Sequence, residues 1–397
     1  MRNIFYIFLI FFVFFSCSKN FKNSSYQITG TIENEDLITI DLDNADLFSP
    51  QRWTYFSSVF NKVKTIILET NKDALVTQFF KFSAYGDFLY ILNSQNPKEF
   101  LIFNKEGKFI RKIGGLGGGP GEYIHVYDFT IDPDNQIIYL LCDRVINKYS
   151  IDGVFLGALR IDTHTSSIQY SHGKLYVESR TDYLLRELDI ENGKQTNQFL
   201  DRKQYNKGWV VDSYFYEGGP FKHRSSVSPK FVHLFMDTIV TITKNGPMPF
   251  LAIKSKHLTT NSDLDATAGM KPSEKIEYIK SKNRIFCITH YFETKNHIYF
   301  RYYHGRNIHT IFYDLISHTY QHAALFNDFV FKHSSEVIQH IIFSDSNGVY
   351  ESFYPLHNKF FFEKIRQGEL APDLDKRDQL MKLDEEANPV IFYYSYD

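Results

Sequence analysis

Short apolar runs separated by turn residues recur along most of the chain in a fixed order of strand, strand, turn and strand. The order is read in three successive segments, YGDFLYILN-KEFLIFN-KEG-KFIRKIGG, DNQIIYLLC-VINKYS-IDG-VFLGALRI and SHGKLYVES-LLRELD-IENG-KQTNQFL. Glycine in each turn accommodates the positive φ that tight hairpins require. Helix signals are nearly absent before residue 260. The pattern predicts an all-β chain built from repeated antiparallel units.

An apolar residue followed by tyrosine marks the same position in five of these units. The pairs are Leu89-Tyr90, Ile138-Tyr139, Leu175-Tyr176, Ile298-Tyr299 and Val349-Tyr350. A related strand over residues 236–244 fills the long gap between the third and fourth pairs. The six units recur at intervals of about 37 to 64 residues, which bracket the period of propeller blades, roughly 40 to 50 residues.

A four-stranded unit of this kind cannot bury both of its faces alone. Radial stacking buries the aromatic faces between neighbours and leaves only short edges exposed, so we predict a six-bladed β-propeller. A β-sandwich, or two unrelated β domains, is the alternative that short strands also allow. Early and final strands, at residues 37–42 and 389–396, suggest that the two chain ends share one blade and close the ring. Residues 272–282 and 363–386 are predicted helical or loop insertions, the second on the outside.

The first residues have the pattern of a processing segment. Arg2 precedes an unbroken apolar run over residues 4–15, shorter than the about 20 residues of a membrane-spanning helix. The run ends in Phe14-Phe15-Ser16-Cys17, which resembles a bacterial lipobox except that Phe14 stands where leucine is usual. We therefore expect a lipoprotein signal peptide over residues 1–16, lipidation at Cys17, a flexible tether over residues 17–36 and the propeller over residues 37–397. The alternative is an ordinary signal peptide that contains a cysteine.

These features predict an exported protein, held by acyl chains in the outer membrane of a Gram-negative-type envelope. The residues after Cys17 form no acidic cluster, which favours the periplasmic face. Cys142 and Cys287 would lie on opposite sides of a propeller, too far apart for a disulfide, and are expected to be buried thiols.

Composition narrows the function. The 44 basic and 46 acidic residues nearly balance, which argues against nucleic acid as a partner. The 15 histidines include no pair at metalloprotease or zinc-finger spacing, and no nucleophile motif stands out. We expect no cofactor and leave metal binding open.

Three segments carry a family resemblance. VKTIILETNKDALVTQFFKF, FLIFNKEGKFIRKIGGLGGGPGEY and EEANPVIFYYSY are similar to the first strand, the glycine-rich signature and the closing strand of six-bladed β-propeller lipoproteins related to NHL-repeat propellers. The likeness is strongest over residues 63–153. Ile67 departs from it, since the family often has proline there. The resemblance implies a propeller fold and a lipid anchor, and it implies no single established activity.

The glycine-rich segment at residues 113–123 fits neither nucleotide-binding pattern. No lysine follows the glycines as in a Walker loop, and a strand pattern rather than a helix lies downstream. We interpret it as a crossing between blades, in which Glu122 and Tyr123 could lie at the mouth of the central channel. The alternative for Glu122 is that it accepts hydrogen bonds from backbone N–H groups of the loop.

Charged residues that follow predicted second strands are further candidates for ligand binding: Asp143, Arg144, Arg180, Arg301, His304 and Arg306. A ring of arginines would suit carboxylates or acidic sugars, whereas each residue alone could be a solvated surface group. The sequence favours a non-catalytic binding or scaffolding propeller for a cell-envelope protein or for a small or carbohydrate ligand. An NHL-like or carbohydrate-active enzyme, a lyase or hydrolase with its site in the channel, remains the alternative.

Overall fold

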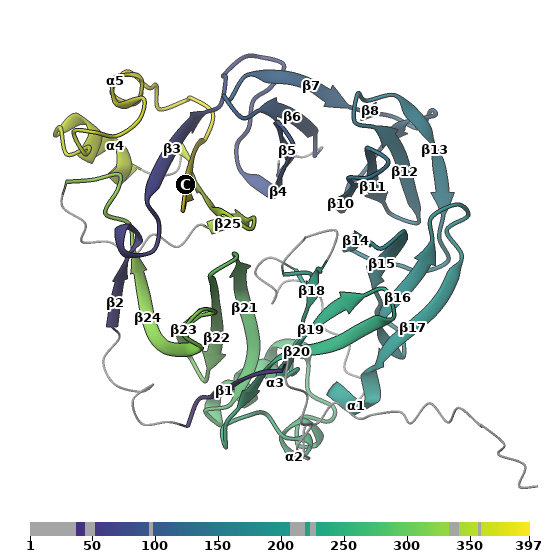
Figure 1. Cartoon of the computed structure of the whole chain (residues 1–397). Coiled ribbons are helices and arrows are strands. Elements are labelled where there is room, and N and C mark those ends of the chain that lie inside the picture. The colour runs from purple at the N-terminus through teal and green to yellow at the C-terminus, as the bar shows by residue number, and fades with distance from the viewer. Residues whose placement is uncertain are drawn as a thin grey trace, which may run out of the picture. The chain divides into compact units, whose positions relative to one another are not determined.

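The computed structural model describes residues 37–43, 52–94, 98–206, 219–222, 228–332, 341–355 and 359–397. The predicted signal peptide, Cys17 and the whole of the predicted tether lie outside these ranges. Among the described residues, no helix is long and apolar enough to cross a bilayer. Six sheets of four or five strands lie around a common centre, so the predicted six-bladed β-propeller is confirmed (Figure 1).

Blades 1 to 3 are each built from one uninterrupted stretch of chain, with four antiparallel strands in sequence order from the inside outward. Blade 1 contains β4 (Phe79–Tyr85), β5 (Phe88–Asn93), β6 (Phe100–Asn104) and β7 (Phe109–Ile113). Blade 2 contains β10 (Asp128–Asp132), β11 (Ile137–Cys142), β12 (Val145–Ser150) and β13 (Phe155–Arg160). Blade 3 contains β14 (Ile168–Ser171), β15 (Lys174–Glu178), β16 (Tyr183–Asp189) and β17 (Gln195–Asp201), and the short α1 (Arg202–Asn206) follows it.

Blades 4 to 6 each receive a strand from the start of the chain. Blade 4 contains β18 (Lys230–Phe231), β19 (Thr238–Thr243), β20 (Gly246–Lys254) and the added β1 (Ile38–Asp41). Blade 5 contains β21 (Ile285–Glu293), β22 (His297–His304), β23 (Asn307–Asp314), β24 (Thr319–Phe326) and the added β2 (Arg52–Tyr55). Blade 6 contains β25 (Ile341–Ser344), β26 (Gly348–Phe353), β27 (Val390–Ser395) and the added β3 (Lys62–Ile67).

The two chain ends share blade 6, as predicted. Strand β3 pairs antiparallel with β27, from Ile67 opposite Val390 to Lys62 opposite Ser395. The early strand singled out at residues 37–42 has a different role, because β1 pairs parallel with β20 and completes blade 4. Strand β3, which closes the ring, is thus the last of three N-terminal strands, β1, β2 and β3, that lie along the outer edges of three neighbouring blades.

The apolar-tyrosine pairs all fall on the second strand of a blade, where both sheet faces are covered by neighbouring blades. Tyr90, Tyr139, Tyr176 and Tyr350 are almost fully buried. The hydrophobic clusters lie in the seams between blades: one joins Phe82 and Leu89 of blade 1 to Tyr350 of blade 6, for example. Contact between neighbouring blades therefore holds the ring together, as expected for sheets that cannot stand alone.

The two predicted insertions contain helices. The first holds α2 (Asn261–Asp265) and α3 (Pro272–Ser281), and the second holds α4 (Lys359–Arg366) and α5 (Arg377–Leu380) at the periphery of blade 6 (Figure 1). A short 3-10 helix, Phe56–Ser58, links β2 to β3. Cys142 in blade 2 and Cys287 in blade 5 are free thiols, the first partly and the second fully buried.

Candidate functional site

The glycine-rich segment forms a tight corner between β7 of blade 1 and β10 of blade 2. Its two short strands, β8 (Gly115–Leu116) and β9 (Glu122–Tyr123), pair parallel. The Glu122 carboxylate accepts a hydrogen bond of 2.8 Å from the backbone N–H of Gly119. The Tyr123 hydroxyl is buried and donates to the Ile113 carbonyl oxygen at 3.2 Å, and this burial raises the pKa of Tyr123. These contacts hold the corner itself.

Gly114 shows why this corner needs glycine. Its φ is +67°, and a Cβ there would lie 2.7 Å from the Tyr123 ring and 2.9 Å from the Tyr149 hydroxyl. The Tyr149 hydroxyl in turn donates to the Gly121 carbonyl oxygen at 2.9 Å. The segment is thus closed by two tyrosines packed against its backbone.

The other predicted site residues are spread over three blades. In blade 2, His164 lies between Asp143 and Arg144: its Nδ1 is 3.6 Å from Asp143 Oδ1, and its Nε2 accepts from Arg144 Nε at 3.1 Å. Arg180 lies in the hairpin after β15 of blade 3 and is partly exposed.

Three of the predicted residues belong to blade 5. Arg301 is buried on β22 and donates from Nε to the Tyr299 hydroxyl at 3.0 Å. Arg306 is exposed and donates to the Glu277 carboxylate of α3 at 2.7 Å. No ring of arginines around one ligand site is formed by these positions.

His304 belongs to a row of four imidazoles between blades 4 and 5. Ring centroids are separated by 4.8 Å from His257 to His304, 5.8 Å from His304 to His309 and 5.5 Å from His309 to His322. Burial lowers the pKa of His304, His309 and His322, the last to about 4. The described residues nevertheless contain no group of three or more His, Cys, Asp or Glu side chains arranged to hold a metal ion.

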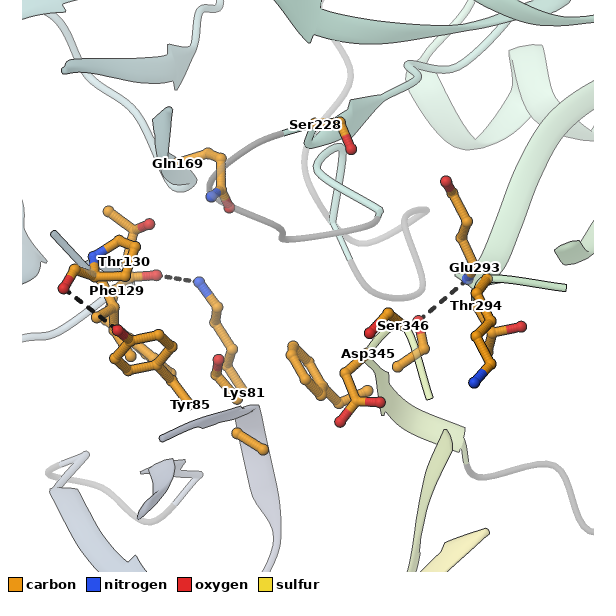
Figure 2. Close-up of a pocket in the computed structure, with 17 residues that line it drawn as sticks. Lys81, Tyr85, Phe129, Thr130, Gln169, Ser228, Glu293, Thr294, Asp345 and Ser346 are labelled. Carbon is orange, nitrogen blue, oxygen red and sulfur yellow. Dashed lines mark hydrogen bonds between the residues drawn. The ribbon is translucent and has the colours of Figure 1, made fainter. Parts of the chain in front are cut away.

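A cavity of about 400 Å³ lies in the central channel and draws residues from all six blades (Figure 2). Most of its lining comes from the carboxyl-terminal halves of the inner strands and from the hairpins that follow them. Those residues are Lys81, Ser83, Ala84, Tyr85, Phe129, Thr130, Ile131, Pro133, Gln169, Ser228, Glu293, Thr294, Lys295, Phe343, Ser344, Asp345 and Ser346. The eight candidates from the sequence are not among them.

One side of the cavity is built around Lys81 of β4. Its Nζ lies 2.7 Å from Asp128 Oδ1, and both side chains are almost fully buried. Asp128 also accepts from the backbone N–H of Ile168 at 2.8 Å and from the Ser167 hydroxyl at 3.2 Å, so one carboxylate links blades 1, 2 and 3. The Lys81 ammonium further stands 4.3 Å from the centroid of the Phe129 ring.

The opposite side is built around Glu293 at the end of β21 (Figure 2). Its Oε2 lies 3.2 Å from the Nζ of Lys230, whose side chain is only 2% exposed, and accepts from the Tyr291 hydroxyl at 2.7 Å. Burial lowers the pKa of Lys230, while the nearby Glu293 carboxylate opposes that shift. Burial, together with the Glu293 charge, raises the pKa of Tyr291. This second buried pair joins blades 4 and 5.

The hairpin of blade 6 supplies the third part of the lining. Asp345 accepts from the backbone N–H groups of Asn347 and Gly348, both at 2.9 Å, and from the Tyr393 hydroxyl at 3.1 Å. The Ser344 hydroxyl accepts from the Glu293 backbone N–H at 3.1 Å. These bonds fix the inner end of blade 6 against blade 5.

The cavity lies at the opposite end of the blades from most of the residues that sequence reasoning chose. Asp143, Arg144, Arg180, His304 and Arg306 all follow or end second strands. Inner and second strands run antiparallel, so residues that follow a second strand lie at the other end of the blade from residues that follow an inner strand. Polar residues near the ends of inner strands, such as Glu293 on β21 and Ser344 on β25, lie at the cavity, but such residues are too common in strands to have located it from the sequence.

Comparisons with known proteins place the chain in a family. Residues 18–395 match the family described as Domain of unknown function (DUF4934), and the chain belongs to it. No curated protein matches the sequence.

Two solved structures from Bacteroides match this chain. A protein of Bacteroides fragilis NCTC 9343, whose name marks it as expected to be exported, shares 16% identity with a TM-score of 0.70, over 91% of this chain and 99% of its own. A DUF4221 family member of Bacteroides vulgatus ATCC 8482 shares 13% identity with a TM-score of 0.49, over 84% and 96% of the two chains. The first likeness supports the propeller fold. The resemblance to NHL-like lipoproteins stays a prediction.

Proposed function

We propose that this protein is an exported, lipid-anchored propeller of the cell envelope that binds a small ligand in its central cavity without transforming it. The observation that carries the proposal is the cavity itself. Its volume of about 400 Å³ falls within the roughly 300–1,000 Å³ of small-molecule sites, and residues from all six blades converge on it.

The buried ion pairs in the wall favour binding over catalysis. Lys81 and Lys230 are each held by a carboxylate of a neighbouring blade, at 2.7 and 3.2 Å. Such pairs rigidify a wall and leave its charged groups engaged with each other, which suits a preformed binding site. The Bacteroides fragilis relative, by its name expected to be exported, and the apolar leader ending at Cys17 support the envelope location.

The ligand proposal is tested with the chain that starts after Cys17 and with variants that fill or spare the cavity. Ligand-observed NMR is run with a panel of neutral sugars, acidic sugars, amino sugars, amino acids and dicarboxylates. At least one class should bind the parent protein and lose binding in Ser83→Trp, which fills the channel. Ser317→Trp, on the outer side of blade 5, should bind as the parent does. No binding by any class, or equal binding by Ser83→Trp, would contradict the proposal.

The anchor is tested separately in cells. Metabolic labelling with a fatty acid should tag the full chain, and Cys17→Ser should abolish both the label and membrane recovery. A labelled Cys17→Ser variant, or an unlabelled parent chain, would contradict lipidation at this residue.

A further inference from the structure

The charged groups that line the channel cavity cancel each other. Two are cations, Lys81 and Lys295, and two are anions, Glu293 and Asp345. The partners behind them, Asp128 for Lys81 and Lys230 for Glu293, are an anion and a cation. These charges sum to zero, so a ligand with a net charge would lose its hydration here without meeting an excess of the opposite charge.

Hydroxyl groups dominate the remaining polar lining. Seven lining residues carry one: Ser83, Tyr85, Thr130, Ser228, Thr294, Ser344 and Ser346. A hydroxyl both donates and accepts, so it matches another hydroxyl in either direction and does not select a charged group. Thr130 illustrates this, because its oxygen accepts from the Tyr170 backbone N–H at 2.9 Å and its own proton stays available to donate.

Glu293 adds a strong acceptor to this set. Both described contacts of its carboxylate, with Lys230 and Tyr291, are made by Oε2. Oε1 makes no hydrogen bond to any residue that the structure describes, and the side chain keeps 19% of its surface exposed. An oxygen of this kind accepts from a ligand O–H, while the adjacent Lys230 offsets the carboxylate charge.

Apolar surfaces lie between the polar groups. Phe343, which is only partly buried, lines the cavity together with Ala84 and Ile131, whereas the ring of Phe129 is 1% exposed and packs against Phe100. Sites that combine aromatic faces with a few fixed polar groups bind molecules that have both apolar and polar edges. A pyranose ring has C–H faces and an equatorial rim of hydroxyls.

From these features we infer that the ligand of the channel cavity is an uncharged polyhydroxyl compound of the sugar class, oriented by a hydroxyl that donates to Glu293 Oε1. This inference rests on the proposed function, since it names the chemistry of the same cavity.

Three probes that share the same pyranose ring but differ in charge test this inference: glucose, glucuronate and glucosamine. Affinities for the chain that starts after Cys17 are measured by chemical-shift titration at pH 7. Glucose should bind, and glucuronate and glucosamine should each bind at least tenfold more weakly. Ser83→Ala should weaken glucose binding about three- to tenfold, the loss of one hydrogen bond. Ser317→Ala, on an exposed hairpin, is the matched control and should not change it.

Glu293→Gln is a second test variant, which removes the carboxylate charge but keeps the shape of the side chain. It should weaken glucose binding and reduce the discrimination against glucuronate, because the acceptor charge is gone. Its fold is checked by the dispersion of its amide spectrum.

The other outcomes separate the two proposals. If glucuronate or glucosamine binds more tightly than glucose, and Ser83→Trp abolishes that binding, the cavity is the ligand site but the ligand class is wrong. The ligand class is equally wrong if only non-sugar members of the panel bind there. Glucose binding that survives Ser83→Trp overturns the inference, and a panel without any binder overturns both proposals.

Discussion

Blades 1 to 3 and blades 4 to 6 form two halves of the ring that are built in different ways. In the first half every blade is a four-stranded meander, and its outer strand, β7, β13 or β17, follows its neighbour through a hairpin. In the second half β1, β2 and β3 are added to the outer edges of three successive blades, and their partners lie some 200 or more residues further along the chain. Local contacts hold the outer edge of the first half, and long-range contacts hold that of the second.

The difference shows where the ring is vulnerable. An outer strand that a hairpin joins to its neighbour can detach and pair again while the blade stays connected. Strand β3 and its partner β27 come from opposite ends of the described chain, and their pairing within blade 6 closes the ring. The loss of contacts at this closure should therefore cost more free energy than an equivalent loss at β17.

The largest effect is expected at Gly107, where the β6–β7 hairpin of blade 1 meets β3. Its φ is +92°, and an added Cβ would lie 2.1 Å from the Ile67 carbonyl oxygen. Gly86 also has a positive φ, +54°, but has no atom within 4 Å of the added Cβ. Gly86→Ala should cost about 1–2 kcal/mol for the backbone alone, and Gly107→Ala about 1–3 kcal/mol more for the clash. Urea denaturation measures the free energy of unfolding of both variants. Equal losses in the two would mean that the contact of Gly107 with β3 does not contribute to stability.

Proline substitutions compare the outer strands of blades 6 and 3. Thr65 on β3 is fully buried and donates from its backbone N–H and its hydroxyl to Asp375, at 2.9 and 2.7 Å. Thr65→Pro should lower the free energy of unfolding by roughly 2–4 kcal/mol, because both bonds are lost.

Thr196 on β17 is the matched position, exposed and at a shift of strand register. Thr196→Pro should cost less than about 1 kcal/mol. Thermal unfolding of the two variants gives the comparison, and a larger loss for Thr196→Pro would reverse the ranking of the two halves.

Glu351, at the seam of blades 5 and 6, should make the stability of the second half of the ring depend on pH. It is fully buried, accepts from the Tyr394 hydroxyl at 2.8 Å and from Asn327 Nδ2 at 3.0 Å, and burial raises its pKa to about 8. The folded state thus holds this proton up to a higher pH than the unfolded state, so stability should fall as pH rises from about 4.5 to about 8. Glu351→Gln should flatten this dependence, whereas the exposed Glu363→Gln on α4 should retain it. An unchanged pH profile in Glu351→Gln would exclude this carboxyl as the cause.

A smaller effect of opposite sign is expected at the seam of blades 4 and 5. Burial lowers the pKa of His322 to about 4, with the neighbouring His309 as a second cause. The unfolded chain binds this proton already near pH 6.5, so stability should fall as pH decreases from about 6.5 to about 4. His322→Gln should reduce the acid slope, and His172→Gln, in an exposed hairpin of blade 3, should leave it in place. The free energy of unfolding, measured between pH 4 and 7, tests this prediction. A steeper loss of stability toward acid pH in His322→Gln than in the parent protein would contradict the assignment to His322.

The sequence predicted the blades because second strands are the most constrained. They are covered on both faces and paired on both edges, so the apolar-tyrosine pairs at Tyr90 and Tyr139 read clearly. The added strands could not be assigned to blades, since a four-residue run such as Ile38–Asp41 fits any outer edge. The pairing of this strand, β1, with β20 is determined only by the arrangement of the complete ring.

The cavity was not predictable for a similar reason. Lys81 and Glu293 lie in strands whose sequences, FFKFSAY and IFCITHYFE, are typical of ordinary β segments with a few polar residues. They are brought to one cavity by the radial arrangement of blades 1 and 5, more than 200 positions apart. The glycine-rich corner was correctly interpreted as a crossing because its chemistry is local: the glycines and the Glu122 carboxylate contact each other.

The path of the first strands also sets an order for folding. Residues 38–67 leave the ribosome early, yet their partner strands β20, β24 and β27 begin only at residues 246, 319 and 390. Until then the nascent chain carries unpaired strands at its start, and blades 4 and 6 cannot reach four strands. Open strand edges invite pairing with other chains, and long loop closure is slow. Synthesis that stops before residue 390 should therefore yield an aggregation-prone product rather than a smaller propeller.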